Sequence, residues 1–191
     1  MAISIDSVTV LLLAAGRGER FGGDKLAAPF RGRALGEHAA AMLAVLPCAA
    51  HIAVTGPSAI DLAALGFDCR RAPADAPMSV SLKLGIAAAA ESDCDACLVA
   101  LADMPLVPAS HIRALLAAHD GTLTATLSGE TRMVPALIAR SAFPLIAALS
   151  GDQGARALLR DAPGVAASPA WLVDIDTPGD AARNSDQPGG R

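Results

Sequence analysis

The chain has 191 residues and a formal net charge of −4; hydrophobic residues make up 53% of it and aromatic residues only 3%. This length suits one domain with a sizeable aliphatic core, and the lack of any Lys/Arg block argues against a nucleic-acid-binding surface, which needs clustered cations. The apolar run 8–15 is too short to cross a membrane and follows no basic stretch, so we expect a cytoplasmic protein that binds neither membrane nor nucleic acid.

Short apolar runs and helical spacing predict strands that alternate with helices over the first two-thirds of the chain. In chain order, these elements are a strand at 8–13, a Gly-rich loop at 16–25, a helix at 34–46, a strand at 51–54, a short helix at 58–65, a strand at 67–70, a helix at 79–90, a strand at 96–101 and a helix at 108–118. This alternation indicates an α/β fold in three layers, with a mostly parallel, doubly wound sheet in the middle.

The last third of the chain has a less regular pattern. Its predicted elements are an edge or mixed strand at 122–127, a strand at 134–138, helices at 141–149 and 153–160, and a last strand at 171–175. The tail at 184–191 is polar and contains Gly and Pro, so we expect it to be disordered. The prediction is therefore a single domain over residues 1–183.

Polar residues follow three of the predicted strands. They are the Gly-rich loop that starts at Gly16, the carboxylate of Asp103, and the pair Asp174 and Asp176. Ligands of doubly wound sheets bind beyond the carboxyl ends of the strands. These residues are therefore the first candidates for a functional site.

The Gly-rich loop fits neither of two common phosphate-binding patterns. A dinucleotide-binding GxGxxG read from Gly16 needs Gly where Phe21 stands, and a Walker A loop needs Ser or Thr where Leu26 follows Lys25. Glycines still allow backbone N–H groups to approach phosphate oxygens, and Arg20 and Lys25 supply the positive charge that a triphosphate needs. The alternative is an ordinary surface turn.

Three carboxylates are candidate ligands for a hard cation such as Mg²⁺, which prefers oxygen ligands. Asp103 follows a buried strand directly, although an Asp at this place can also serve a turn before Pro105. Asp174 and Asp176 are two residues apart, so on a strand they share a face. One of this pair could complete the metal site and the other could cap the helix after Pro178.

The cysteines and histidines give little sign of a metal site. Cys94 and Cys97 have the spacing of a zinc or redox motif, but no second such pair and no nearby His completes a ligand set. We interpret both as reduced core residues. The four histidines are scattered along the sequence, so we interpret them as packing or surface residues.

Five segments resemble, in order, the motifs of the MobA-like nucleotidyltransferases that act on the molybdenum cofactor, and most of all the molybdenum cofactor cytidylyltransferases. They are Leu13-Ala14-Ala15-Gly16 with Arg20, Gly22 and Lys25; Met78-Ser79-Val80-Ser81-Leu82; Leu101-Ala102-Asp103-Met104-Pro105; Gly151-Asp152-Gln153-Gly154-Ala155-Arg156; and Asp174-Ile175-Asp176-Thr177-Pro178. The resemblance covers nearly the whole chain, from Val10 to about Asp180. It implies the Rossmann-like nucleotidyltransferase fold.

The resemblance also implies a reaction and its partners. The CMP group of CTP would pass to the phosphate of molybdopterin, with Mg²⁺ or Mn²⁺ as cofactor, to give the cytosine dinucleotide form of the cofactor and pyrophosphate. A xanthine-dehydrogenase-family molybdoenzyme would then be a transient docking partner. Guanylyl-transferring relatives tend to have Gly where Ala15 stands, which favours CTP over GTP.

The resemblance assigns roles to individual residues. Those implied to bind the nucleotide are Leu13, Ala14, Ala15, Gly16, Gly18, Arg20, Lys25, Ser79, Ser81 and Asp103. Arg20, Lys25 and Asp103 are the implied catalytic residues. The implied metal ligands are Asp103, Asp174 and Asp176, with Asp174 favoured as the second ligand beside Asp103. Asp152 and Arg156 are implied to bind the acceptor.

Several alternatives stay open. Ser79 and Ser81 could cap the helix that follows them, and Arg156 could pair with Asp152 on a helix surface. The chain departs from the family pattern at Pro77, where Gly is usual, and at 133–134, where Met and Val replace Gly and a small polar residue or His. The acceptor could therefore be a sugar or polyol phosphate, the nucleotide could be GTP, or the protein could be a non-catalytic nucleotide-binding partner in cofactor maturation.

Overall fold

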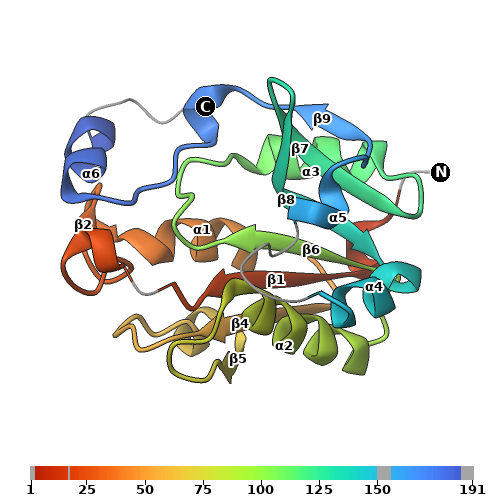
Figure 1. The fold of residues 1–191 in the computed structure, drawn as a ribbon, viewed down its shortest axis with the longest axis horizontal. Helices are drawn as coiled ribbons and strands as arrows, with labels where there is room; N and C mark the ends of the chain where they lie inside the picture. Colours follow the sequence, from red (N-terminus) through yellow and green to blue (C-terminus); the bar gives the residue numbers. More distant parts are fainter. Residues whose placement is uncertain (1–2, 17, 150–155, 186–191) are drawn as a thin grey trace.

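A computed structural model describes residues 3–16, 18–149 and 156–185. Its centre is a seven-stranded sheet in the order β5-β4-β1-β6-β8-β7-β9 (Figure 1). The strands are β1 (Val8–Ala14), β4 (Ala50–Thr55), β5 (Asp68–Arg71), β6 (Ala96–Leu101), β7 (Leu123–Ser128), β8 (Thr131–Ala139) and β9 (Gly164–Ala166). Only β8 among these strands runs against the others, so the mostly parallel sheet predicted from the sequence is confirmed.

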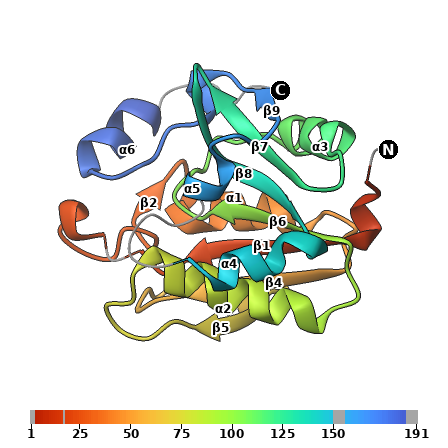
Figure 2. The ribbon, with the colours of Figure 1, turned by 45° about the vertical axis from the view of Figure 1, so that its right-hand side comes forward.

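Helices cover both faces of the sheet and make three layers (Figures 1 and 2). On one face, α1 (Leu35–Ala44) packs on the even-numbered residues of β1, and α3 (Ala109–Ala118) packs on β7, β8 and β9 in the same hydrophobic cluster. On the other face, α2 (Met78–Glu91) packs on the odd-numbered residues of β1 and on β4, α4 (Phe143–Ala147) packs against α2, and α5 (Arg156–Leu159) packs on β7 and β8. Every residue of β1 is buried, as expected for a strand with helices above and below it.

The order of the strands places a crevice beyond β1 and β6. From β1 the chain moves outward to β4 and β5, and then returns to β6 on the other side of β1. The two carboxyl ends lie side by side, because the amide of Ala102 donates to the carbonyl of Leu13 at 3.0 Å. The loops after β1 and β6 thus leave the sheet at its topological switch point, where ligands of such folds bind.

Two predicted elements are wrong. Residues 58–65 contain only a 3₁₀ turn, at Ala63–Leu65, because the side chain of Asp24 binds the start of this segment. Residues 171–175 form no strand; a 3₁₀ turn at Pro169–Trp171 precedes a segment without regular secondary structure. The sheet edge belongs instead to β9, which pairs with β7.

The structure also contains elements that the sequence did not predict. A small hairpin joins β2 (Pro29–Phe30) to β3 (Arg33–Ala34). The final helix, α6 (Pro178–Ser185), includes the first two residues of the tail expected to be disordered, and residues 186–191 lie outside the described part. Of the helix predicted at 153–160, the structure describes α5 and not residues 153–155. None of the described helices is long and apolar enough to cross a membrane.

A small third core anchors the segment before α6 to the rest of the domain. Ile175 is fully buried against Phe30 of the hairpin and Leu35 of α1. At the far end of α6, the Arg31 guanidinium donates to the carbonyl of Asn184, which caps the helix C-terminus. Residues 172–185, here called the C-terminal arm, are thereby held against the hairpin (Figure 1).

Candidate active site

The Gly-rich loop after β1 depends on glycine at two positions with left-handed backbone. Gly18 has φ of 62° and Gly22 has φ of 78°. A Cβ at position 18 would lie 2.8 Å from the carbonyl oxygen of Gly23 and 2.9 Å from the Cβ of Lys25. Residue 18 must therefore be glycine for the loop to fold back tightly over Lys25.

A hollow of about 320 Å³ opens between this loop and the segment that follows β4. Its lining residues are Gly16, Gly18, Gly22, Gly23, Asp24, Lys25, Pro57 and Ser58. Four of them are glycines, so backbone groups rather than side chains form much of its wall. Such a wall suits phosphate oxygens, which accept hydrogen bonds from backbone N–H groups.

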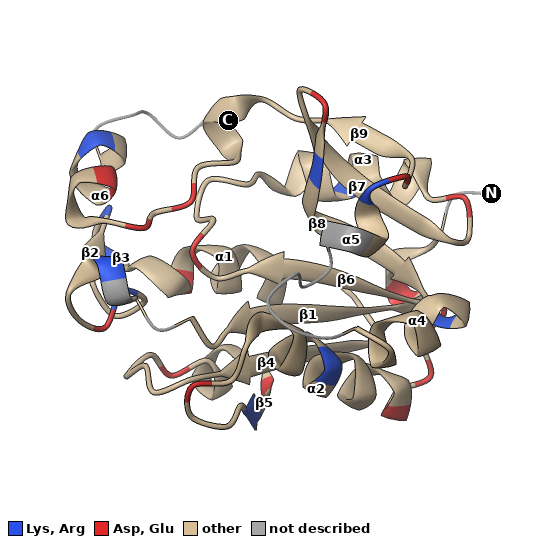
Figure 3. Cartoon of the chain, viewed as in Figure 1, with Lys and Arg blue, Asp and Glu red and all other residues tan. Residues whose placement is uncertain are grey.

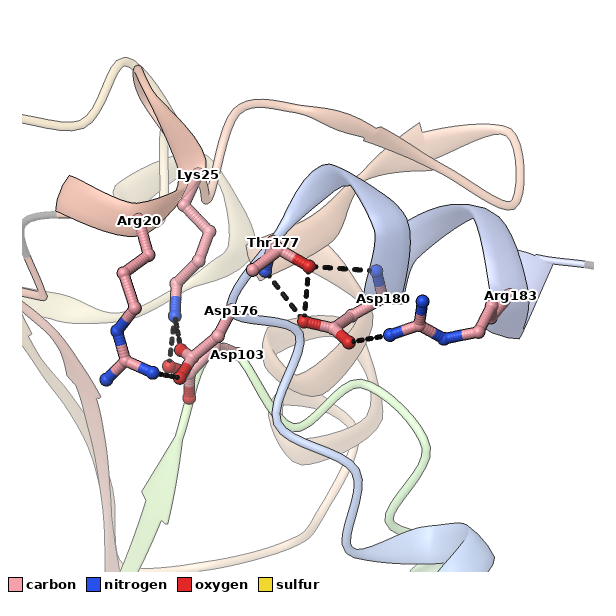
Figure 4. A network of polar contacts seen from close by, with 7 residues as sticks. All are labelled: Arg20, Lys25, Asp103, Asp176, Thr177, Asp180 and Arg183. Carbon is pink, nitrogen blue, oxygen red and sulfur yellow. Dashed lines mark hydrogen bonds and ion pairs between the residues drawn. The ribbon is translucent and has the colours of Figure 1, made fainter.

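Lys25 is the centre of the charged cluster beside this hollow (Figure 4). Its side chain is only 7% exposed, and its Nζ donates to Asp103 Oδ2 at 2.6 Å and to Asp176 Oδ1 at 3.0 Å. The second oxygen of Asp176 pairs with Arg20 at 3.1 Å. We call these four residues the switch-point cluster.

The surroundings keep Lys25 charged. Burial acts to lower the pKa of its ammonium, but the charges and hydrogen bonds of Asp103 and Asp176 outweigh burial and raise the pKa above its ordinary value. Lys25 is therefore a permanent cation at neutral pH.

Two distant parts of the chain bring the carboxylates together. Asp103 stands two residues beyond the end of β6, at the edge predicted from the sequence. Asp176 comes from the C-terminal arm, where the amide of Ile175 donates to the carbonyl of Asp103 at 3.1 Å. Figure 3 shows the acidic residues of this arm near the basic residues of the β2–β3 hairpin, at the same end of the sheet.

Asp174 and Asp176 do not lie on a strand as predicted, because their segment has no regular secondary structure. Asp174 is exposed, and Asp176 is the one that reaches Lys25. Neither caps α6. Thr177 does so in a reciprocal capping box with Asp180: the amide and hydroxyl of Thr177 donate to Asp180 Oδ2 at 2.8 and 2.7 Å, and the amide of Asp180 donates to the Thr177 hydroxyl at 3.1 Å.

The other predicted nucleotide-binding residues lie around the hollow or behind it. Leu13 and Ala14 are buried at the end of β1, Ala15 is half-buried, and Gly16 is exposed. The backbone of Ala15 packs closely against Gly56: a Cβ on Gly56 would lie 3.1 Å from both the Cα and the carbonyl oxygen of Ala15.

Ser79 and Ser81 are buried in the first turn of α2, and neither caps the helix. The residue at the N-cap is Pro77, which makes no side-chain cap. Contact of either serine with the base stays a prediction. Of the predicted acceptor-binding residues, Asp152 and the side chain of Arg156 lie outside the described part of the chain.

Asp24 is a site residue that the sequence reasoning missed. One of its oxygens accepts from the Ser58 hydroxyl at 2.7 Å and from the amide of Ala27 at 3.2 Å, and the other accepts from the amide of Ala59 at 2.7 Å. Burial acts to raise the pKa of Asp24, but these hydrogen bonds outweigh it and lower the pKa below its ordinary value. Asp24 thus clamps the two walls of the hollow together, and only its place next to Lys25 hinted at this.

The described residues contain no group of three or more His, Cys, Asp and Glu that could hold a metal ion. Cys94 and Cys97 are both buried in the core, as expected from the sequence. What the switch-point cluster offers is two carboxylates that already share one cation. This donor set fits Mg²⁺ or Mn²⁺, because such ions are commonly held by one or two carboxylates plus substrate phosphates.

Comparison with known proteins agrees with this geometry. The model of a family described as the MobA-like NTP transferase domain matches residues 10–167. Nicotine blue oxidoreductase of Paenarthrobacter nicotinovorans is 33% identical over 189 residues, which cover 88% of this chain and 85% of that protein.

Two solved structures show the same architecture. A nucleotidyl transferase from Methanothermobacter thermautotrophicus is 28% identical with a TM-score of 0.76, over 94% of this chain and 96% of that one. The manganese complex of Rv0371c from Mycobacterium tuberculosis is 22% identical with a TM-score of 0.76, over 95% of this chain and 100% of that one. The family model and the 33% identical relative both span most of the sequence, and the chain therefore belongs to the MobA-like NTP transferase family.

Proposed function

We propose that this protein transfers the CMP group of CTP to the phosphate of molybdopterin and releases pyrophosphate. Membership of the MobA-like family supports a nucleotidyltransferase, and the resemblance of the five sequence motifs supports this donor and this acceptor. The observation that carries the proposal is the switch-point cluster, in which Lys25 and Arg20 stand with Asp103 and Asp176 beside a glycine-walled hollow.

The charged residues of the cluster would divide the work of the reaction. Lys25 and Arg20 would bind oxygens of the triphosphate, and loop amides near Gly16 and Gly18 would bind others. The carboxylates of Asp103 and Asp176 would hold Mg²⁺ or Mn²⁺, and the ion would supply neutralisation of phosphate charge. Because Asp174 is exposed while Asp176 reaches Lys25, the structure favours Asp176 over Asp174 as the second ligand.

The transfer itself needs positioning rather than a covalent nucleophile of the protein. An oxygen of the acceptor phosphate attacks the α-phosphorus of CTP and forms a new P–O bond. The bond from that phosphorus to the bridging oxygen of the β-phosphate breaks, and pyrophosphate leaves with the electron pair. The acceptor oxygen is already ionised, so no general base is required, and alignment with charge neutralisation supplies the catalysis.

The choice of CTP depends on Ala15. Its half-buried backbone is held against Gly56, so its methyl group has little freedom to move aside for a larger base. Gly at this position in guanylyl-transferring relatives would leave that space open. A pyrimidine is therefore the proposed base.

One relative points to a second candidate function. The 33% identical protein is named nicotine blue oxidoreductase, so a redox reaction on such a compound is the alternative. Phe21 interrupts the GxGxxG pattern of a nicotinamide dinucleotide site, and the charged cluster fits phosphates better than a hydride donor. We therefore place nucleotidyl transfer first.

The test is pyrophosphate release by the purified protein with Mg²⁺ and molybdenum-loaded molybdopterin, comparing CTP, GTP, ATP and UTP. Release with CTP alone is the expected result. Release with GTP would overturn the base assignment and keep the reaction. Silence with all four, with an acceptor validated on a known enzyme, would overturn the proposal; sugar phosphates as acceptors, and NADH oxidation in the presence of nicotine blue, would then be measured on the same sample.

A further inference from the structure

Lys25 occupies the position that a metal ion would share between Asp103 and Asp176. Its ammonium lies within hydrogen-bond distance of both carboxylates, at 2.6 and 3.0 Å, and the side chain is almost fully buried. Arg20 forms an ion pair with the other carboxylate oxygen of Asp176. Two cations and two anions thus form a neutral, internally satisfied cluster.

We propose that Lys25 acts as a resident cation of the nucleotide-free site, so that a divalent metal binds tightly only together with a triphosphate. This inference deepens the proposed function and rests on its assignment of the nucleotide and metal to this cluster. The triphosphate would draw Lys25 onto its oxygens and so free the carboxylates for the metal.

Charge balance is the first argument. A divalent ion entering alone would add two positive charges to a cluster whose Asp103 and Asp176 charges are already matched by Lys25 and Arg20. A bare triphosphate would bring its own negative charges up to the same two carboxylates. Metal and triphosphate together bring opposite charges, and each relieves the repulsion that the other would meet.

Ligand number is the second argument. Asp103 and Asp176 are two side chains, while Mg²⁺ and Mn²⁺ take about six oxygen ligands in near-octahedral geometry. The remaining ligands have to come from water or from the triphosphate. The phosphate oxygens therefore supply both missing ligands for the metal and a new partner for Lys25.

Anchoring of the carboxylates is the third argument, because contacts from distant parts of the chain fix the backbones that carry them. Buried Ile175 and its hydrogen bond to the Asp103 carbonyl hold both backbones. The capping box of Thr177 and Asp180 fixes the chain directly after Asp176 (Figure 4). Lys25 has a flexible four-carbon stem, so the exchange of partners falls to it.

Coupling of this kind is reciprocal: if the triphosphate strengthens metal binding by some factor, the metal strengthens triphosphate binding by the same factor. The coupling should also depend on the charge at position 25. Removing that charge should let the metal bind in the absence of nucleotide.

The experiment measures Mn²⁺ binding by electron paramagnetic resonance of the free ion, without acceptor and without turnover. For the wild type we expect Mn²⁺ to bind at least about tenfold more weakly alone than with saturating CTP, after correction for Mn²⁺ held by CTP in solution. In Lys25→Met, which keeps the length of the side chain and removes its charge, nucleotide-free Mn²⁺ binding should tighten at least about tenfold.

Two further variants locate the effect. Lys83→Gln, at a half-buried lysine of α2 outside the cluster, should bind Mn²⁺ as the wild type does. The double variant with Lys25→Met and Asp103→Asn should lose the gain, because the gain needs both carboxylates.

The inference is overturned if Lys25→Met binds Mn²⁺ no more tightly than the wild type, or if the double variant keeps the gain. Should Lys25→Met fail to fold, equal Mn²⁺ affinity of the wild type with and without CTP would overturn it instead. A negative result here leaves pyrophosphate release by the wild type untouched, and absence of that release leaves the Mn²⁺ result standing, so the two proposals fail separately.

Discussion

Among the described residues, the switch-point cluster and a second group of polar side chains differ in charge and in exposure. The switch-point cluster is made of ionised groups, and it opens to solvent from Lys25, 7% exposed, through Asp103, 24%, to Asp176, 36%. The second group, the α3–β7 seam, consists of His111, His119, Thr124 and Thr126, all at most 3% exposed.

The seam is neutral, and its polar groups are paired. The Thr126 hydroxyl donates to the Pro135 carbonyl at 2.6 Å, so its oxygen accepts from His111 Nε2 at 2.8 Å, which assigns the proton of this neutral ring to Nε2. His119 Nδ1 lies 3.0 Å from the Thr124 hydroxyl. These side chains satisfy each other and leave little to offer a ligand.

This difference in charge and exposure identifies the switch-point cluster as a candidate functional site and the α3–β7 seam as a structural element. Partly buried charges are costly to keep, and an opening toward solvent beside a hollow lets a ligand exchange for their partners. Neutral pairs sealed between a helix and a strand hold the fold together and carry no such opening. His111 and His119 are thus packing residues, and the carboxylates of the switch-point cluster are the candidates for chemistry.

The strongest test of this division is Asp103→Asn, which keeps the shape of the side chain and removes its charge. We expect kcat for pyrophosphate release to fall by about 10²–10³-fold, the size typical of losing one electrostatic group from a transition state. The melting temperature should also fall, because the buried ammonium of Lys25 loses one of its two carboxylate partners, so turnover is compared per folded molecule.

Asp95→Asn is the matched control, because Asp95 is exposed just before the opposite end of the same strand, β6. Its turnover should equal that of the wild type. If Asp103→Asn keeps full turnover, Asp103 is no metal ligand and the cluster is only a structural ion-pair network.

The seam should show the reverse behaviour. In Thr124→Val, His119 loses its hydroxyl partner inside the core, so the free energy of unfolding should fall by about 1–3 kcal/mol. Turnover per folded molecule should not change. Thr124 lies at the amino end of β7, whereas the site lies beyond the carboxyl ends of β1 and β6.

Urea unfolding of Thr124→Val and of Thr131→Val would measure this. Thr131 is exposed at the start of β8, and its substitution should change stability little. Equal stability of the two variants, or loss of turnover in folded Thr124→Val, would contradict the assignment of the seam to support.

Asp24 combines the two roles, because it lines the hollow and also holds its walls together through hydrogen bonds. In Asp24→Ala the walls lose three hydrogen bonds, so we expect the KM for CTP to rise about tenfold while kcat changes less. Ser58→Ala removes one of these bonds and should act in the same direction with a smaller effect.

Asp61→Asn is the control for the Asp24 variants. Asp61 accepts from the amide of Ala64 in the same segment, away from the hollow. An effect of Asp24→Ala on kcat alone would show that the clamp acts on chemistry and not on binding of the nucleotide.

Sequence reasoning found the parts of the site that local pattern decides. The strand before Gly16 and the strand before Asp103 are short apolar runs, and two parallel neighbours must end at one edge. It failed where distant contacts decide. The helix predicted at 58–65 does not form, because Ser58 and Ala59 donate hydrogen bonds to Asp24 instead. The strand predicted at 171–175 does not form, because Ile175 is buried beside the hairpin.

The pairing of Lys25 with Asp176 shows the same limit most clearly. The two residues are 151 positions apart, and no spacing rule connects them. The resemblance implied that both Asp174 and Asp176 face the nucleotide or the acceptor, and no local pattern supported the preference for Asp174. The side of the arm that faces Lys25 is set by the bonds of Ile175 and by the capping box after Asp176, neither of which a local pattern reveals.

The smallest expected effect is on the pH dependence of stability. Burial lowers the pKa of His111 and of His119 below the ordinary value of 6.5, with Asp120 acting against burial at His119. His38 behaves in the same way, chiefly through burial. Between these lowered pKa values and 6.5 the unfolded chain binds more protons than the folded one, so the contribution is complete above pH 6.5 and is lost as the pH falls.

Lys25 has the opposite sign. Its pKa is raised, so its contribution to stability is complete below its ordinary value of 10.5 and is lost only as the pH rises through the raised value. From pH 7.5 to 5.5, urea unfolding should therefore show falling stability in the wild type and a smaller fall in His119→Gln, while Lys25→Met should keep the slope of the wild type. An unchanged slope in His119→Gln would mean that the seam does not resist protonation, and a flattened slope in Lys25→Met would mean that the two regions titrate together instead of separately.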